Sequence, residues 1–357
     1  NLVAAIPSLH AGMSAALAAF LWNRVQRGWR PLLVAYPLIM AFALVYSAEH
    51  YVIDLLLGWA LRGRRITRGQ LAATAVSYCG ALLVFGSAFF WSFGGTIARF
   101  LNAPHEDEVI FTSGSTEAIN LVSYAWAAPR LQPGDEIVLS VMEHHANIVP
   151  WHFLRERQGV VLKWVEPEAD GSLPPEKVLA AVGPRTKLIA VTHMSNVTGT
   201  VVDVGAIARG TDVPVLVDGS QASVHMPVDV GALGVDFYCI TGHKLYGPSG
   251  SGAIWIRADR QTEMRPFMGG GDMIRTVTLD EVTYADPPLK FEAGTPGIVN
   301  QIGLGVALEY MMDLGMENIA AHEHALRDYA RERLRSLNWL TVQGDAPDKG
   351  AIFSMTM

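Results

Sequence analysis

Cysteine is scarce in this chain of 357 residues, which contains only Cys79 and Cys239. Two cysteines so far apart form no disulfide framework and have no spacing typical of a metal site. We therefore expect no metal and a reducing compartment, with a cytoplasmic location for residues 96–357. A basic leader before a cleavage site is also lacking, and the first residue is not methionine, so we expect the chain to begin within a longer reading frame.

Lysine is absent from the first hundred residues, which carry eight arginines and only two acids, Glu49 and Asp54. Their net charge is +6, whereas that of the remainder is −13. The arginines lie between apolar runs at 11–22, 31–47, 50–61 and 70–91 and form no face for nucleic acid. The pattern predicts an α-helical, membrane-like segment with the arginine clusters in the cytoplasm, and it makes a membrane the partner of residues 1–91.

Three polar residues stand out in this apolar part. His10 follows Pro-Ser-Leu, and Asp54 comes four residues after His50. On a helix this spacing lets the carboxylate hold an imidazole that attacks phosphorus, while His10 protonates the leaving oxygen. The motifs resemble the second and third motifs of the phosphatidic acid phosphatase superfamily over about residues 1–60. The first motif and a Ser-Arg pair are missing, so we expect no working phosphatase, and structural histidines are the competing interpretation.

From about Ala98 short apolar strands alternate with amphipathic helices, which predicts a mainly parallel α/β sheet. A long helical stretch to about Leu337 then leads into a strand near 339–343, which indicates a second, smaller domain. We expect a phosphatase-like fragment at 1–61, a membrane helix and junction at 62–95, a large domain at 96–295 and a partial small domain at 296–357. The expected strands are 108–112, 136–140, 160–165, 187–193, 213–217, 235–240 and 253–257, and the expected helices are 115–127, 147–158, 174–182 and 203–209.

Polar residues gather at the ends of these strands, where open α/β sheets bind ligands. The segment from Thr112 to Glu117 joins a strand to a helix and could cradle a phosphate, although such residues are also typical of a plain helix cap. Asp218 ends one apolar strand, and Lys244 directly follows another. A lysine there is costly to desolvate, so it could form a Schiff base with an aldehyde cofactor whose ring nitrogen pairs with the aspartate. Taken singly, Asp218 could be a cap and Lys244 a surface lysine.

Six further motifs lie within residues 96–357. They are Met-Glu-His-His-Ala-Asn-Ile-Val-Pro-Trp (142–151), Ser-Asn-Val-Thr-Gly-Thr (195–200), Asp-Gly-Ser-Gln (218–221), Gly-His-Lys-Leu-Tyr-Gly-Pro (242–248), Gly-Gly-Gly (269–271) and Phe-Glu-Ala-Gly-Thr-Pro (291–296). Together they resemble the sulfur-mobilisation group of cysteine desulfurases and selenocysteine lyases. The resemblance implies the aspartate aminotransferase-like fold of class V enzymes, pyridoxal 5'-phosphate as cofactor and a homodimer. It also implies L-cysteine or selenocysteine as substrate, a sulfur-acceptor protein as partner and a role in iron–sulfur cluster assembly.

The same resemblance assigns roles to single residues. It implies that Lys244 is the Schiff-base lysine and proton shuttle, that Asp218 pairs with the pyridine nitrogen, and that the ring of His144 stacks on the cofactor. Lys244 and His144 are thus the catalytic candidates. Asn196 and Gln221 would contact the phenolic oxygen of the cofactor. The phosphate would be held by Ser115, Thr116, Thr241, His243 and, from the second subunit, Thr295.

The reaction of this group removes the α-proton of cysteine and lets an enzyme thiolate attack the substrate sulfur, which leaves alanine and a persulfide. Cys79 lies in an apolar run and Cys239 inside an expected strand. We therefore expect the nucleophile to lie beyond Met357 and the activity to be impaired. Two other interpretations stay open, a membrane phosphatase of lipid or isoprenoid phosphates and an inert chimeric chain. An aminotransferase or epimerase on the same fold also fits the motifs.

Overall fold

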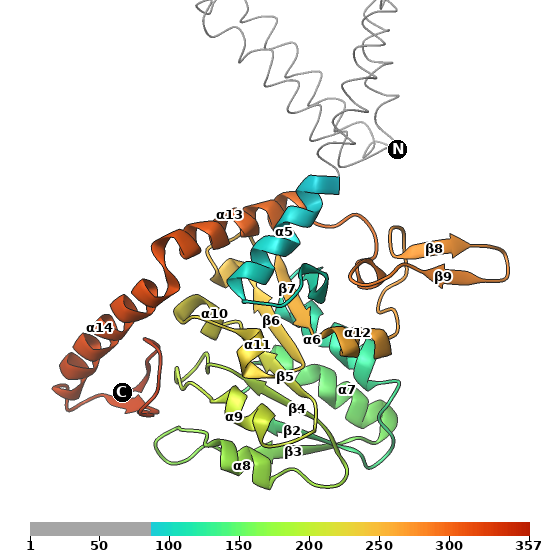
Figure 1. The fold of residues 1–357 in the computed structure, drawn as a ribbon. Helices are drawn as coiled ribbons and strands as arrows, with labels where there is room; N and C mark the ends of the chain where they lie inside the picture. The colour runs from blue at the N-terminus through green and yellow to red at the C-terminus, as the bar shows by residue number, and fades with distance from the viewer. Residues whose placement is uncertain (1–86) are drawn as a thin grey trace, which may run out of the picture. The chain divides into compact units, whose positions relative to one another are not determined.

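The computed structural model describes residues 87–357. The predictions for His10, His50, Asp54 and Cys79 lie outside the described residues, as does the predicted membrane-like segment up to residue 86. The chain divides into two compact units, Asn1–Ser87 and Ala88–Met357, and the second contains the sheet shown in Figure 1. Within residues 87–357 there is no helix with both the length and the apolar character needed to cross a membrane.

A seven-stranded sheet forms the centre of this second unit (Figure 1). Its strands are β1 (Val109–Thr112), β2 (Glu136–Ser140), β3 (Val161–Val165), β4 (Thr186–Thr192), β5 (Val215–Asp218), β6 (Phe237–Thr241) and β7 (Gly252–Ile256). Their order across the sheet is β1-β7-β6-β5-β4-β2-β3. Only β7 is antiparallel to its neighbours, so the mainly parallel α/β sheet that the sequence predicts is confirmed.

Helices precede, connect and follow these strands in the sequence. They are α5 (Ser87–Phe100), α6 (Ser115–Leu121), which continues as a π-helical turn (Val122–Ala127), α7 (Val149–Gln158), α8 (Pro175–Ala180), α9 (Val204–Arg209), α10 (Ala222–His225), α11 (Val230–Leu233) and α12 (Ala258–Glu263). α5 runs across residues 95 and 96, where we placed a domain boundary from the sequence. The domain boundaries themselves stay a prediction.

Successive side chains of each central strand enter two different hydrophobic cores, one on each face of the sheet. In β5, Val215 and Val217 pack into one core together with residues of α5 and α9, whereas Leu216 packs into the other with residues of α6 and α7. A strand that is covered on both faces needs apolar residues at every position. This is why β5 and β6 stand out in the sequence as apolar runs that end in polar residues.

The C-terminal part begins with the long helical stretch that the sequence predicts. It consists of α13 (Ile298–Leu314) and α14 (Met316–Arg335), which break at Gly315. The φ angle of Gly315 is 84°, which residues with a side chain rarely adopt, so glycine permits the change of direction there. A small sheet of β10 (Thr341–Gln343) and β11 (Ser354–Thr356) follows and contains the strand expected near 339–343.

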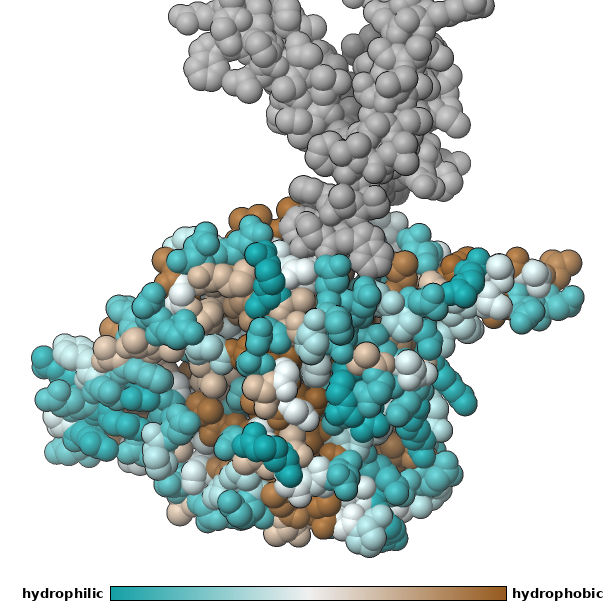
Figure 2. Space-filling view, in the orientation of Figure 1, coloured by the Kyte–Doolittle hydropathy of each residue, from teal (hydrophilic) through white to brown (hydrophobic). Residues whose placement is uncertain are grey.

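A hairpin of β8 (Ile274–Val277) and β9 (Val282–Tyr284) extends away from the main sheet (Figure 1). This hairpin is not among the strands expected from the sequence. Its apolar side chains are largely uncovered, because Val277 is 58% exposed and Leu279 at the tip is completely exposed. Figure 2 shows apolar groups along this arm of the molecule. A two-stranded hairpin is only marginally stable alone in water, so this arm has a surface suited to packing against another protein.

Candidate active site

The six strands β1 to β6 run in one direction and end at the same edge of the sheet. Five of them end in a polar residue, namely Thr112, Ser140, Thr192, Asp218 and Thr241. The first residue of the antiparallel β7, Gly252, lies opposite both Thr112 and Thr241. A Cβ atom on Gly252 would lie only 2.6 Å from the Cα atom of Gly114, so glycine allows the loop after β1 to approach this edge closely.

Asp218 is the buried acidic residue of this edge, and it is only 4% exposed. Its Oδ1 atom accepts hydrogen bonds from the backbone amide of Ser220 over 3.0 Å and from the Ser220 hydroxyl over 2.6 Å. The Ser220 hydroxyl also lies 2.5 Å from the Ser115 hydroxyl. No hydrogen bond to Oδ2 comes from residues 87–357, so this oxygen remains available to a ligand.

Lys244 supplies an amine without a partner beside this edge. It ends a short 3-10 turn, η8 (Gly242–Lys244), directly after β6. The turn is anchored by Gly242, whose amide donates to the carbonyl of Ser251 over 2.8 Å. The lysine side chain is half-buried, and its Nζ atom makes no hydrogen bond or ion pair with any residue that the structure describes.

His144 comes from a third element and interacts electrostatically with both of these groups. Its Nδ1 atom accepts a hydrogen bond from the amide of Ala146 over 3.2 Å and so caps the turn η7 (His145–Asn147). Burial is the largest cause that lowers the pKa of His144; the charge of Asp218 raises this pKa, and that of Lys244 lowers it again. The ring is therefore neutral near pH 7, with its proton on Nε2.

Sequence reasoning missed Glu143 and Ser220, which belong to the same group. Glu143 is buried and accepts hydrogen bonds from the Ser140 hydroxyl over 2.5 Å and from the Asn147 amide group over 2.7 Å. Burial raises the pKa of Glu143 to about 8. The signal that could have revealed it was an acid directly before a candidate catalytic histidine inside a motif. Ser220 could have been found only from the fold.

The other predicted residues are placed in different ways. Ser115 is buried, and its hydroxyl contacts Ser220, while the Thr241 hydroxyl lies 3.4 Å from Nδ1 of His243. A Cβ atom on Gly114 would lie 3.1 Å from the Thr241 hydroxyl, so the loop after β1 and the end of β6 are adjacent. Asn196, after β4, and Gln221, after β5, are half-buried. Thr116 and Thr295 are exposed.

Cys239 does not have the properties of a nucleophile. It is the free cysteine of the described residues, and it is completely buried within β6 with its Sγ atom 3.8 Å from Oδ1 of Asp218. Burial raises the pKa of its thiol well above the usual range. Among residues 87–357 no cluster of His, Cys, Asp or Glu is arranged to hold a metal ion.

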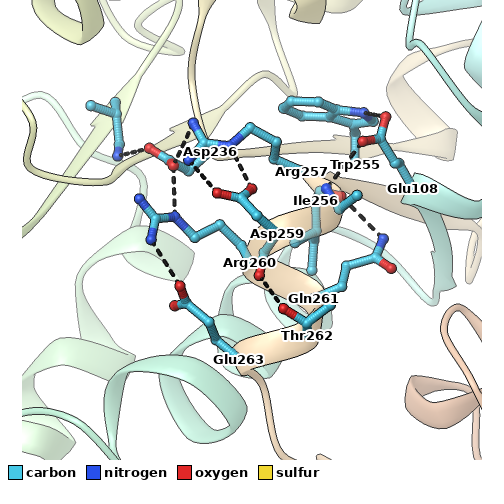
Figure 3. A network of polar contacts seen from close by, with 12 residues as sticks. Glu108, Asp236, Trp255, Ile256, Arg257, Asp259, Arg260, Gln261, Thr262 and Glu263 are labelled. Atoms are coloured by element: carbon cyan, nitrogen blue, oxygen red, sulfur yellow. Dashed lines mark hydrogen bonds and ion pairs between the residues drawn. The ribbon is translucent and has the colours of Figure 1, made fainter.

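Charged residues also gather at the opposite edge of the sheet, before β6 (Figure 3). The carboxylate of Asp236 accepts from Nε of Arg260 over 2.9 Å and pairs with Arg257 over 3.0 Å. Arg257 also pairs with Asp259, and Arg260 with Glu263. A cavity of about 480 Å³ at this edge is lined by none of the predicted site residues. Because every one of these charges has an opposite partner, the network fastens α12 to the sheet and offers no free group for chemistry.

The group at the carboxyl edge fits pyridoxal 5'-phosphate. The unpaired amine of Lys244 can bond to an aldehyde, and the free oxygen of Asp218 can hold a proton on a pyridine nitrogen. The neutral ring of His144 can stack on a flat heteroaromatic ring. These three groups come from three separate elements, and the charges of Asp218 and Lys244 both act on His144 at one edge of the sheet.

Similarity to known proteins agrees with this geometry. Residues 90–357 match the family Aminotransferase class-V, and residues 1–67 match the PAP2 superfamily. A probable cysteine desulfurase of Mycolicibacterium paratuberculosis is 46% identical over 265 residues, which are 73% of this chain and 39% of that protein. A cysteine desulfurase of Salmonella gallinarum is 46% identical over 259 residues, 71% of this chain and 64% of that protein.

A solved structure shares the same fold. The crystal structure of the cysteine desulfurase CsdA from Escherichia coli matches with a TM-score of 0.71 and 33% identity, over 82% of this chain and 71% of CsdA. The chain spans less than two thirds of the length of the two relatives named above. The family match covers most of the chain and all of the strand-end residues described here, and the chain therefore belongs to the class V aminotransferase family.

Proposed function

We propose that the chain is a pyridoxal-phosphate-dependent protein of the cysteine desulfurase type that acts on L-cysteine or selenocysteine. One observation carries this proposal. Buried Asp218 and Lys244 lie at the same edge of the sheet, and each has an atom, an oxygen and an amine respectively, that makes no hydrogen bond with the described residues. The two cysteine desulfurases that are 46% identical support this class of substrate. A sulfur-acceptor protein and sulfur supply for iron–sulfur clusters complete the proposal.

Each residue of the site has a separate role in the proposed reaction. When bound, pyridoxal phosphate supplies an aldehyde that links to amines and a protonated ring that withdraws electrons. Asp218 would hold the proton on the pyridine nitrogen, because its Oδ1 atom already accepts from Ser220 and its other oxygen is free of the described residues. Lys244 would take the α-proton of the amino acid as a general base. The ring of His144 would lie against the cofactor, and Ser115, Thr116, Thr241, His243 and a partner's Thr295 would hold its phosphate.

We infer that sulfur transfer by the described residues is impaired. The attacking group must be a thiolate that a substrate can reach. Cys239 fails on both counts, because it is buried in β6 and burial raises the pKa of its thiol. Binding of the cofactor and of the amino acid needs no cysteine, so these steps are expected without a persulfide on Cys239.

We also propose a homodimer. The hairpin β8–β9 carries exposed Val277, Leu279 and Val282 on an arm separate from the main sheet, and a second copy of the chain would cover them. In the dimer Thr295, which is exposed in the single chain, would meet the phosphate of the partner's site.

For residues 1–91 we propose attachment to a membrane, with residues 96–357 in the cytoplasm. The match of residues 1–67 to the PAP2 superfamily supports a phosphatase-like origin of this part. A phosphatase of lipid or isoprenoid phosphates is therefore the second candidate function. It predicts metal-independent phosphate release that is lost in His10→Ala, His50→Ala and Asp54→Asn.

The first candidate is tested with the full chain, pyridoxal phosphate and L-cysteine. We expect cysteine to change the visible absorbance of the bound cofactor, and alanine to form slowly or not at all. Lys244→Ala should abolish the spectral change, whereas Lys187→Ala, an exposed lysine at the opposite edge, should keep it. An unchanged spectrum in the wild type would favour the inert chimeric chain, and an equal response in Lys244→Ala would refute the assigned role of the lysine.

A further inference from the structure

Glu143 joins three consecutive segments beside the candidate active site. Its Oε1 atom accepts from the hydroxyl of Ser140 at the end of β2, and its Oε2 atom accepts from the side-chain amide of Asn147 in η7. The carbonyl oxygen of Asn147 in turn accepts from the indole Nε1 of Trp151 in α7 over 3.1 Å. Glu143, Asn147 and Trp151 are buried, so the chain of hydrogen bonds is protected from water.

The turn that this chain of hydrogen bonds closes is the one that carries His144. Because Trp151 occupies the carbonyl oxygen of Asn147, the Asn147 amide group has to point its hydrogens toward Glu143. The Ser140 hydroxyl is also fixed, since it accepts from the amide of Met142 over 3.1 Å. Residues 140 and 147 are therefore both tied to one carboxyl group, and the backbone between them has little freedom to move the His144 ring.

We propose that Glu143 is a positioning residue: its carboxyl group fixes the turn of residues 140–147 and thereby the place of the His144 ring at the candidate active site. This inference deepens the proposed function and rests on it for the role of His144. Glu143 is expected to touch neither cofactor nor substrate.

The protonation of the Glu143 carboxyl group is shaped by its surroundings as well as by its hydrogen bonds. Burial is the largest cause that raises the pKa of Glu143 to about 8, and the charge of Asp218 on β5 acts in the same direction. Hydrogen bonds from Ser140, Asn147 and the backbone of Thr192 on β4 lower this pKa. Burial and the charge of Asp218 therefore favour the neutral form of Glu143. Lys244 and His145 are the cationic or titratable groups that also act on the His144 ring.

Glutamine at position 143 imitates the neutral acid. Its oxygen can accept from Asn147, and its amide can donate to the Ser140 hydroxyl, which then acts as acceptor. Alanine at this position removes both bonds and leaves the buried Asn147 amide group unpaired. Glu108 offers a control, because it is a buried acid outside this turn whose Oε2 atom accepts from Nε1 of Trp255 over 3.0 Å.

The test uses the full chain without cofactor, labelled with ¹³C in its histidine rings and followed by NMR over a range of pH. The His144 signal is assigned by its loss in His144→Gln. We expect this signal to show a transition near pH 8 in the wild type and in Glu108→Gln, and no such transition in Glu143→Gln. In Glu143→Ala the signal should move and broaden, and pyridoxal phosphate should bind about tenfold more weakly, which is ~1.4 kcal/mol.

The outcomes separate this inference from the proposed function. A transition near pH 8 that persists in Glu143→Gln would overturn the assignment of the titrating group. A His144 signal in Glu143→Ala that matches the wild type would overturn the positioning role. A wild type that binds no pyridoxal phosphate would refute the proposed function alone, because the His144 signal reports on Glu143 without the cofactor.

Discussion

Gly219 follows Asp218 directly and lets the chain turn after it. A Cβ atom at this position would lie 2.1 Å from the ring of Tyr238, a completely buried residue. The hydroxyl of Tyr238 lies 2.9 Å from Nδ1 of His193, whose backbone amide donates to the carbonyl of Asp218. The residues behind Asp218 are therefore packed and hydrogen-bonded in a fixed arrangement.

Gly219→Ala should destabilise the protein by about 1–3 kcal/mol, because the added methyl group overpacks a buried aromatic ring. Denaturant unfolding measures this change. Gly269→Ala is the control, since nothing lies within 4 Å of a Cβ atom there, and its effect should be small. Equal stability of Gly219→Ala and the wild type would mean that Tyr238 is not packed against this turn.

His193 should make the protein sensitive to acid. Burial lowers its pKa from 6.5 to about 4, so between these values the unfolded chain holds a proton that the native chain lacks. The free energy of unfolding should therefore fall as the pH falls from 6.5 to 4. His193→Asn, which keeps an acceptor for Tyr238, should reduce this slope, and His105→Asn at an exposed site should not. The same slope in His193→Asn and the wild type would refute the assignment.

Single residues of the site could be predicted from the sequence only where they belong to a recognisable motif. Asp218, Lys244 and His144 stand in motifs of the sequence, and the structure brings their charges together. Ser220 and Ser115 are 105 positions apart, and their 2.5 Å contact depends on the neighbouring positions of β1, β7, β6 and β5. No local pattern contains this information, and the same holds for the buried contacts of Glu143.

At the scale of elements, burial decides what the sequence reveals. The strands β2, β5 and β6 are covered on both faces, so each is an apolar run whose ends the sequence marks. The hairpin β8–β9 was missed because its apolar residues alternate with Arg275, Thr276 and Thr283 and enter no core of the single chain. Gly315 was missed as a helix break because the residues on both sides favour a helix.

The hairpin leads to a prediction about assembly. Val277→Asp places a charge on its exposed apolar face and should weaken the dimer at least about tenfold, or ~1.4 kcal/mol. Sedimentation velocity over a range of concentrations measures the dissociation constant. Val161→Asp is the matched control, because Val161 is 41% exposed on β3, far along the sheet order from β1. A wild type that stays monomeric would contradict the proposed homodimer.

At the scale of the whole molecule, the direction of the strands creates the site. The six strands β1 to β6 end at one edge, and the charged network of Asp236, Arg257 and Arg260 lies at the other edge. The sequence predicted the first of these two features, because its candidate site residues follow the strands, and it did not predict the charged network. It could not reveal which charges neutralise one another across the sheet, since that depends on the order of the strands in space.

The most direct measurement of the central claim is reduction of the full chain with borohydride after addition of pyridoxal phosphate, followed by mass mapping of the modified lysine. We predict that the cofactor is fixed on Lys244 and that Asp218→Asn lowers the extent of labelling. Labelling of another lysine, such as the partly buried Lys290, or no labelling at all, would contradict the assignment of this edge of the sheet as a cofactor site.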